Sequence, residues 1–192
     1  MDSRLAQLQF DRSWTLFLDR DGVINKKRDN DYVKAVTEFE WIPGALDALA
    51  LMAPLFQTVV IVTNQQGVGK GVMSEADLNA IHQHMIHKVR LHGGRVDAVY
   101  FAPWLKEQNH PERKPGIGMA QNAKRDFPAI DFTHSLMVGD SVSDVAFGKQ
   151  AGMYTVLIGK PLDPVSTHRP DFVFDTLLEL ANALRAEVGR GK

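Results

Sequence analysis

The sequence predicts an α/β fold class, with a mostly parallel, Rossmann-like central sheet and helices on both of its faces. Short runs of β-branched and other apolar residues alternate with longer segments whose apolar residues recur every three or four positions. This alternation is typical of βαβ crossovers, which cover both faces of a parallel sheet. Polar residues directly follow several of the predicted strands, at the edge of the sheet where ligands bind.

Six strands are predicted from apolar runs that turn-forming residues bound. The second is the clearest, because its sequence QTVVIVT is rich in β-branched residues and has turn signals on both sides. The six predicted ranges are 14–18, 57–63, 96–102, 135–138, 154–158 and 172–174.

Five helices are predicted, four between these strands and one after the last strand. Pro43 and Gly44 open the first, and Ser74 caps the second, with Asp77 three residues later as a variant of the capping box. The second helix places four apolar residues on one face: Leu78, Ile81, Met85 and Val89. The five predicted ranges are 43 to about 56, 74 to about 91, 116–126, 143–151 and 176–187.

The length and composition indicate one domain that spans residues 1–192. The chain has 192 residues, of which 44% are hydrophobic, so it can bury a core. Its 22 Lys plus Arg and 23 Asp plus Glu give a net charge of -1, which argues against a nucleic-acid-coating protein and leaves room for a small anionic substrate. The absence of cysteine excludes disulfides, thiolate nucleophiles and cysteine-ligated metal sites.

The sequence shows no targeting or membrane segment. Residues 1–14 carry mixed charges without an apolar core, and the longest nearly apolar stretch, 45–56, is shorter than the ~20 residues that span a bilayer. We therefore expect a soluble cytoplasmic monomer that has neither membrane nor nucleic acid as a partner.

Polar residues follow the first two predicted strands. Asp19 and Asp21 come directly after the first, and Gly22 permits a tight turn there, although an Asp-rich turn has the same composition. Thr63 and Asn64 end the second strand, where a hydroxyl and an amide can bind an anion together with free backbone N–H groups.

Cations and further carboxylates follow the next two strands. Arg113 and Lys114 precede a predicted helix, and Asp140 and Asp144 follow the fourth strand. Any one of these features is also explained by a solvated loop or an ordinary helix cap. Crowded like charges require a cation that offsets them, and oxygen ligands suit Mg²⁺. The set as a whole therefore predicts a magnesium site at the mouth of the sheet.

Four motifs carry a resemblance to a known superfamily. FLDRDGVIN (17–25), VTNQQGVGKG (62–71), RKPGIGM (113–119) and MVGDSVSD (137–144) resemble, in order and spacing, those of the haloacid dehalogenase (HAD) superfamily. Within it the chain is similar to bacterial D-glycero-D-manno-heptose 1,7-bisphosphate 7-phosphatases and to histidinol-phosphate phosphatases. The resemblance runs from about residue 16 to 158. It implies a HAD-type fold and, because no long insertion interrupts the chain, a single capless domain.

The resemblance also implies roles for particular residues. Asp19 would be the nucleophile and Asp21 the general acid and base of a phosphomonoester hydrolase that forms a phosphoaspartyl intermediate. The implied Mg²⁺ ligands are Asp19, the backbone carbonyl of Asp21, and Asp140. Thr63, the Asn64 backbone N–H and Lys114 would bind the phosphoryl group. Asp144 would orient Lys114 or a metal-bound water, and Arg113 would bind the distal end of a small phosphorylated metabolite.

One segment departs from the heptose-bisphosphate pattern. That branch carries a zinc loop of one Cys-x-His and one Cys-x-Cys pair before its Arg-Lys-Pro, and the positions here hold Ala102, Trp104, His110 and Glu112. No structural Zn²⁺ is expected, since two candidate ligands do not close a site. Trp104 either replaces the metal by packing or stacks on the substrate, and packing is the favoured interpretation.

Several alternatives remain open. The leading function is hydrolysis of heptose bisphosphate, with histidinol phosphate as the alternative substrate, and a nucleic-acid end phosphatase or a non-catalytic binding module as less favoured classes. His84 and His87 share one helix and are interpreted as solvated. Residues 25–32 form a charged run that is either solvated surface or a lid over the site.

Overall fold

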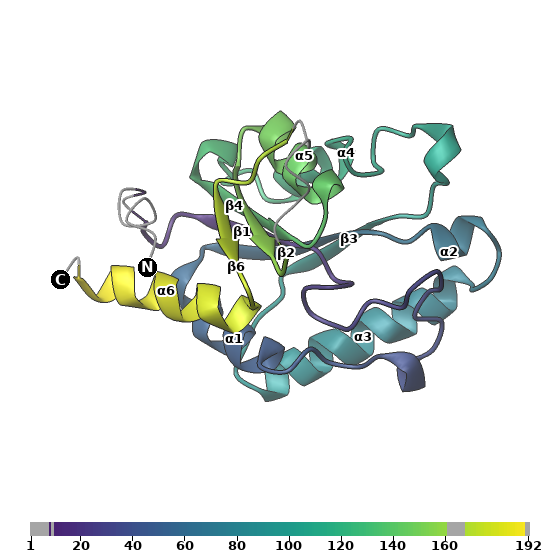
Figure 1. Cartoon of the computed structure of the whole chain (residues 1–192), viewed down its shortest axis with the longest axis horizontal. Helices are drawn as coiled ribbons and strands as arrows, with labels where there is room; N and C mark the ends of the chain where they lie inside the picture. The colour runs from purple at the N-terminus through teal and green to yellow at the C-terminus, as the bar shows by residue number, and fades with distance from the viewer. Residues whose placement is uncertain (1–7, 9, 161–167, 191–192) are drawn as a thin grey trace.

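A computed structural model describes residues 8, 10–160 and 168–190 (Figure 1). Its strands form one six-stranded sheet with the order β3-β2-β1-β4-β5-β6, and every neighbouring pair is parallel. The strands are β1 (Thr15–Leu18), β2 (Thr58–Asn64), β3 (Ala98–Ala102), β4 (Ser135–Gly139), β5 (Tyr154–Ile158) and β6 (Phe172–Phe174). The predicted fold class is therefore confirmed.

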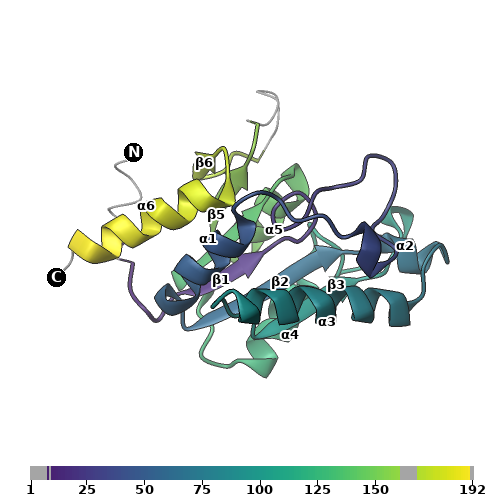
Figure 2. The same ribbon diagram turned by 90° about the horizontal axis from the view of Figure 1, so that it is seen from below.

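Helices cover both faces of this sheet. Figures 1 and 2 show α1, α3 and α6 on one face and α4 and α5 on the other. The helices are α1 (Ala45–Met52), α2 (Gln66–Gly69), α3 (Glu75–Leu91), α4 (Gly118–Asp126), α5 (Val142–Ala151) and α6 (Leu177–Arg190). Among the described residues, no helix combines the length and the apolar character needed to cross a membrane.

The central strands are buried on both faces, which explains why they are continuous apolar runs. Leu16 and Leu18 of β1 pack into the core under α1, α3 and α6, whereas Phe17 between them packs into the core under α4 and α5. All three side chains are fully buried. The sheet is therefore a rigid base for the residues that follow its strands.

The helix boundaries differ from the predicted ones where proline or short turns intervene. The helix predicted over 43–56 ends at Met52 and continues only as a 3₁₀ turn over Ala53–Leu55, because Pro54 has no N–H for an α-helical hydrogen bond. The short helix α2 was not predicted. The predicted capping box is confirmed, since Ser74 and Asp77 each accept a hydrogen bond from the backbone N–H of the other.

Candidate active site

The carboxyl ends of β1, β2 and β4 meet the loop before α4 at a cavity of about 240 Å³. This meeting follows from the strand order, in which β1 lies between β2 and β4. The cavity brings together all of the predicted site residues, namely Asp19, Asp21, Thr63, Asn64, Arg113, Lys114, Asp140 and Asp144. Lys27, Ser141 and Ser143 also line it and were not predicted.

Asp19 is the first residue after β1, and it is nearly buried. Its backbone N–H donates to the carbonyl of Val138 at 2.9 Å, which holds the residue against β4. Burial raises the pKa of Asp19 to about 7; Lys114 opposes the rise, and the carboxylates of Asp144 and Asp21 add to it. The ionised carboxylate therefore depends on neighbouring positive charge.

Lys114 supplies that positive charge from a buried position. Its Nζ lies 2.9 Å from Asp19 Oδ1 and 2.6 Å from Asp144 Oδ1, and it donates to the carbonyl of Val62 at 2.7 Å. Burial alone would lower the pKa of Lys114, but Asp144 and Asp19 raise it above its usual value. The ammonium group is therefore charged and points at the Asp19 carboxylate.

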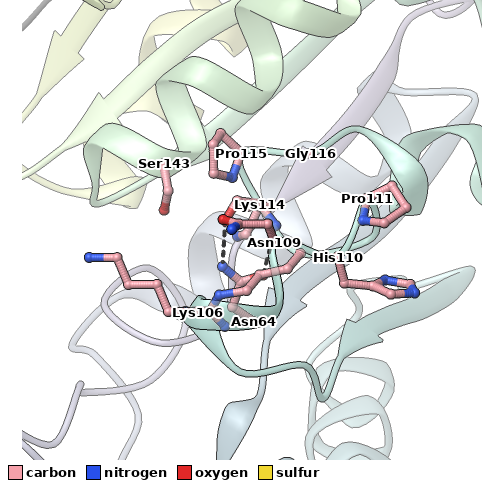
Figure 3. Close-up of a pocket in the computed structure, with 10 residues that line it drawn as sticks. Asn64, Lys106, Asn109, His110, Pro111, Lys114, Pro115, Gly116 and Ser143 are labelled. Carbon is pink, nitrogen blue, oxygen red and sulfur yellow. Dashed lines mark hydrogen bonds between the residues drawn. The ribbon is translucent and has the colours of Figure 1, made fainter.

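Asn64 and Asp144 hold Lys114 in this position. The Asn64 side chain pairs with the backbone of Lys114, donating to its carbonyl at 3.1 Å and accepting from its N–H at 2.9 Å, as the dashed lines in Figure 3 show. Asp144 is itself fixed by the capping box at the start of α5, where it accepts from the backbone N–H and the hydroxyl of Ser141. The side chain of Asn64 is thus engaged with Lys114, which sequence reasoning did not foresee.

Asp21 is held by a set of hydrogen-bond donors. Asn25 Nδ2 donates to its Oδ1 at 2.9 Å, Gln65 Nε2 donates to its Oδ2 at 2.7 Å, and Arg20 Nη2 lies 2.9 Å from both oxygens. Although burial raises the pKa of Asp21, Arg20 and the amide donors lower it below its usual value. The carboxylate is ionised and fixed in orientation.

Arg20 is fully buried and rests on a buried histidine of α3. Its Nη1 lies 3.1 Å from Nε2 of His82, a side chain that is 4% exposed. Burial and the neighbouring Arg20 charge lower the pKa of His82 from its ordinary 6.5 to about 3. His84, by contrast, is half-buried against Phe39, and His87 is exposed.

We expect His82 to make the protein less stable at acid pH. In the unfolded chain His82 binds a proton below about pH 6.5, whereas in the folded chain it does so only below about pH 3. The free energy of unfolding therefore has its full value above pH 6.5 and falls as the pH drops from 6.5 toward 3. Between about pH 7.5 and about pH 5.5 this loss is about 1.4 kcal/mol. Urea unfolding of wild type and His82→Gln at both pH values measures it. An equal pH dependence in the two proteins would contradict the expectation.

Three carboxylates at the mouth of the sheet fit a divalent cation. Asp19, Asp140 and Asp144 each place an oxygen within 4.8 Å of the others. Within the described chain, the buried Oδ1 of Asp140 has no hydrogen-bond partner, and its Oδ2 accepts from Lys27 Nζ at 3.0 Å. A clustered, unpaired carboxylate oxygen is the kind of ligand that Mg²⁺ takes. The Asp21 carboxylate lies outside this cluster and faces Arg20 and Gln65.

Gly22 allows the first strand to turn sharply beneath Asp140. Its φ of +94° is in the left-handed region, and a Cβ at this position would lie 2.2 Å from Asp140 Oδ2. A side chain at residue 22 would therefore displace the carboxylate of Asp140.

A second cavity of about 480 Å³ adjoins the first and shares Asn64, Arg113, Lys114 and Ser143 with it (Figure 3). Its other lining residues are Lys106, Asn109, His110, Pro111, Pro115 and Gly116. None of these described lining residues is acidic, so the cavity is positively charged. Asp19 lines the first cavity and not this one.

The loop that borders this second cavity is held together by side-chain packing. The rings of Trp104 and His110 stack with centroids 3.9 Å apart, and Trp104 Nε1 donates to Glu112 Oε2 at 3.1 Å. Arg113 Nη1 also donates to the carbonyl of Trp104 at 3.1 Å. The contacts agree with the packing interpretation of Trp104, and they use His110 and Glu112, the two candidate ligands among the four residues at the zinc-loop positions.

We expect this loop to keep its structure without metal. Because ring stacking and a hydrogen bond link Trp104 to its neighbours, EDTA should leave the melting temperature nearly unchanged, and Mg²⁺ alone should restore full activity. Elemental analysis of the purified protein, with melting curves in EDTA, provides the measurement. About one tightly bound zinc per chain, with unfolding on its removal, would contradict this expectation.

The sequence interpretation missed Gln65, Arg20 and Lys27, each of which contacts a predicted site residue. Gln65 and Arg20 lie within the quoted motifs and next to predicted site residues. Their position at the end of a predicted strand was the signal that could have identified them. For Lys27 the sequence offered only its place in the charged run 25–32, and that does not predict its contact with Asp140, which is distant in the sequence.

The comparisons with known proteins agree with this geometry. Residues 112–180 match the HAD-hydrolase-like family. A D-glycero-alpha-D-manno-heptose-1,7-bisphosphate 7-phosphatase from Mycobacterium bovis is 42% identical over 132 residues, which cover 69% of this chain and 70% of that protein. A D-glycero-beta-D-manno-heptose-1,7-bisphosphate 7-phosphatase from Neisseria meningitidis serogroup A is 36% identical over 183 residues, covering 90% of this chain and 95% of the relative.

A solved structure shows the same architecture. The D,D-heptose 1,7-bisphosphate phosphatase from B. bronchiseptica, complexed with magnesium and phosphate, matches with a TM-score of 0.79 and 33% identity over 91% of this chain and 99% of that chain. At this identity and coverage, likeness extends beyond the fold to the family. The chain therefore belongs to the HAD superfamily and is a phosphatase.

Proposed function

We propose that the chain is a Mg²⁺-dependent phosphatase that removes the 7-phosphate of D-glycero-D-manno-heptose 1,7-bisphosphate through a phosphoaspartyl intermediate. The observation that carries the proposal is the buried Asp19 carboxylate, 2.9 Å from the Lys114 ammonium group and next to a larger, positively charged cavity. The named relatives support the choice of substrate. The chain is proposed to act as a single capless domain and as a monomer.

The reaction follows from the position of each side chain. Asp19 attacks phosphorus, and the bond from phosphorus to the sugar oxygen breaks. Asp21, which is ionised in the resting site, takes up a proton from solvent before this step and gives it to the leaving oxygen. Water then attacks phosphorus, Asp21 takes its proton, and the bond to Asp19 breaks, which restores the Asp19 carboxylate and leaves Asp21 protonated for the next cycle. Thr63, the Asn64 backbone N–H and Lys114 bind the phosphoryl oxygens.

The proposed metal ligands are Asp19, the backbone carbonyl of Asp21, and Asp140. Bound there, Mg²⁺ would offset the negative charge that the carboxylate and the phosphoryl group bring together. Asp144 orients Lys114, in agreement with the 2.6 Å between them. Lys27, which forms an ion pair with Asp140 at 3.0 Å in this structure, adds a positive charge at the same rim, and its side chain is 53% exposed.

Phosphate release from a panel of substrates with Mg²⁺ tests the proposal. The panel contains both anomers of the heptose bisphosphate, histidinol phosphate, and DNA oligonucleotides with terminal phosphates. We expect kcat/KM for one heptose anomer to exceed that for the other substrates by about 10²-fold, equivalent to about 2.7 kcal/mol. A preference for histidinol phosphate or for DNA ends would mean that this compound, and not the heptose bisphosphate, is the substrate. No turnover of any phosphate ester would indicate a binding module.

Arg113→Ala is expected to raise KM for the heptose bisphosphate about tenfold or more, with kcat little changed. The reason is that Lys114 is the residue that pairs with Asp19, whereas Arg113 lines both cavities, so we assign Arg113 to the part of the substrate that does not react. Steady-state kinetics on the bisphosphate and on p-nitrophenyl phosphate measure the effect. Equal losses in kcat and kcat/KM on both substrates would assign Arg113 to the transferring phosphoryl group instead.

A further inference from the structure

Gln65 connects the two halves of the proposed phosphoryl site through one side-chain amide. It is the first residue after β2, and it is 1% exposed. Its Nε2 donates to Asp21 Oδ2 at 2.7 Å and to Thr63 Oγ1 at 2.9 Å. Because an ionised carboxylate only accepts hydrogen bonds, the amide nitrogen and not the oxygen must face Asp21.

The backbone of Gln65 is fixed independently of this amide. Its N–H donates to the carbonyl of Ala102 at 2.7 Å, and its carbonyl accepts from the N–H of Val68 at 3.2 Å. The turn between β2 and α2 is therefore held at both ends by backbone bonds. The amide nitrogen is not needed to make the turn, and both of its hydrogen bonds end on residues that line the cavity.

The two hydrogen bonds affect Asp21 and Thr63 in different ways. On Asp21, Arg20 contacts both carboxylate oxygens, Asn25 donates to Oδ1 and Gln65 donates to Oδ2, so these donors together fix the orientation of the carboxylate. On Thr63, the hydroxyl oxygen accepts from Gln65, which leaves the hydroxyl hydrogen free to donate to a phosphoryl oxygen. A single amide thereby orients a proton donor and a phosphate binder at once.

We propose that Gln65 is a positioning residue that aligns the acid–base carboxylate of Asp21 with the phosphoryl group bound at Thr63. This proposal rests on the function proposed above for Asp21. It predicts that Gln65 matters most when the leaving group needs a proton, because general acid catalysis contributes about 10²- to 10⁴-fold and depends on alignment. A nitrophenolate leaves without a proton, whereas a sugar alkoxide does not.

The test compares kcat/KM of Gln65→Met on two esters. One is p-nitrophenyl phosphate, and the other is whichever alkyl phosphate the wild-type enzyme hydrolyses fastest in the panel above. We expect the alkyl phosphate to lose about 10-fold more activity than the nitrophenyl ester, with KM little changed. Gln66→Met is the matched control, because Gln66 lies in the same turn and its amide donates to the Tyr32 hydroxyl at 2.8 Å instead. Its ratio between the two esters should equal that of the wild type.

Asp21→Asn separates failure of this proposal from failure of the function on which it rests. If Asp21→Asn shows the leaving-group dependence but Gln65→Met lowers kcat/KM equally on both esters, Gln65 is only structural and the positioning role is overturned. If Asp21→Asn itself lowers kcat/KM equally on both esters, the acid–base role of Asp21 is overturned. Circular dichroism and melting curves check folding. If Gln65→Met does not fold, Gln65→Ser provides a second measurement of the ratio of kcat/KM between the two esters.

Discussion

Asp19→Asn is expected to lower kcat by about 10⁴-fold or more on every phosphomonoester while the protein stays folded. An amide is a poor nucleophile, and the change also removes one charge from the proposed metal site. Stability should not suffer, because burial raises the pKa of Asp19 to about 7 and Lys114 keeps its contact with Asp144. Steady-state kinetics and melting curves of the purified variant give both quantities.

Asp21→Asn is the matched comparison for this variant. It makes the same chemical change two residues away, but it removes a proton donor and not the nucleophile, so formation of the phosphoenzyme from p-nitrophenyl phosphate should partly survive. Ordinary turnover by Asp19→Asn would remove the covalent mechanism from consideration.

Lys114→Met is expected to lower kcat/KM by about 10²- to 10³-fold on any phosphomonoester, the cost of one preorganised donor at a phosphoryl group. It should also destabilise the fold by about 3 kcal/mol, because it leaves Asp19 and Asp144 buried without their cation. Kinetics with p-nitrophenyl phosphate and urea unfolding measure the two effects. On this substrate the loss should exceed that of Arg113→Ala.

Lys26→Met provides a control for the loss of one lysine near the site. Lys26 forms an exposed ion pair with Glu40 at 2.9 Å, with side chains 58% and 67% exposed, so its removal should change stability by less than about 1 kcal/mol and leave kcat/KM unchanged. If Lys114→Met behaved like Lys26→Met, the buried ion pairs at Lys114 would not be important for catalysis or stability.

The sequence was sufficient for the fold because the signals involved are local or repeat regularly. Alternation of strands and helices predicts a parallel sheet, and the carboxyl ends of such strands share one edge, which explains why Asp19, Thr63 and Asp140 were expected together. Helix ends were less predictable. Pro54 truncates α1 after Met52, although apolar spacing continues beyond it.

Contacts between distant side chains were not predictable in the same way. His82 follows Leu78 by four residues and lies on the apolar face of α3, so helical spacing accounts for its burial, but its contact with Arg20, 62 residues away, does not follow from that spacing. Likewise, the sequence offered two alternatives for Trp104, and only the structure shows its ring stacked on His110. Such contacts depend on how whole elements pack, which spacing along the chain does not determine.

Trapping the phosphoenzyme tests the role of Asp19 most directly. The enzyme is mixed with the heptose bisphosphate and Mg²⁺, quenched in acid within one turnover, and treated with borohydride, which reduces an aspartyl phosphate to homoserine. Peptide mapping by mass spectrometry then locates the change. We expect homoserine at residue 19, only when substrate is present and never in Asp19→Asn. Homoserine at another aspartate, or continued phosphate release by Asp19→Asn at the wild-type rate, would contradict it.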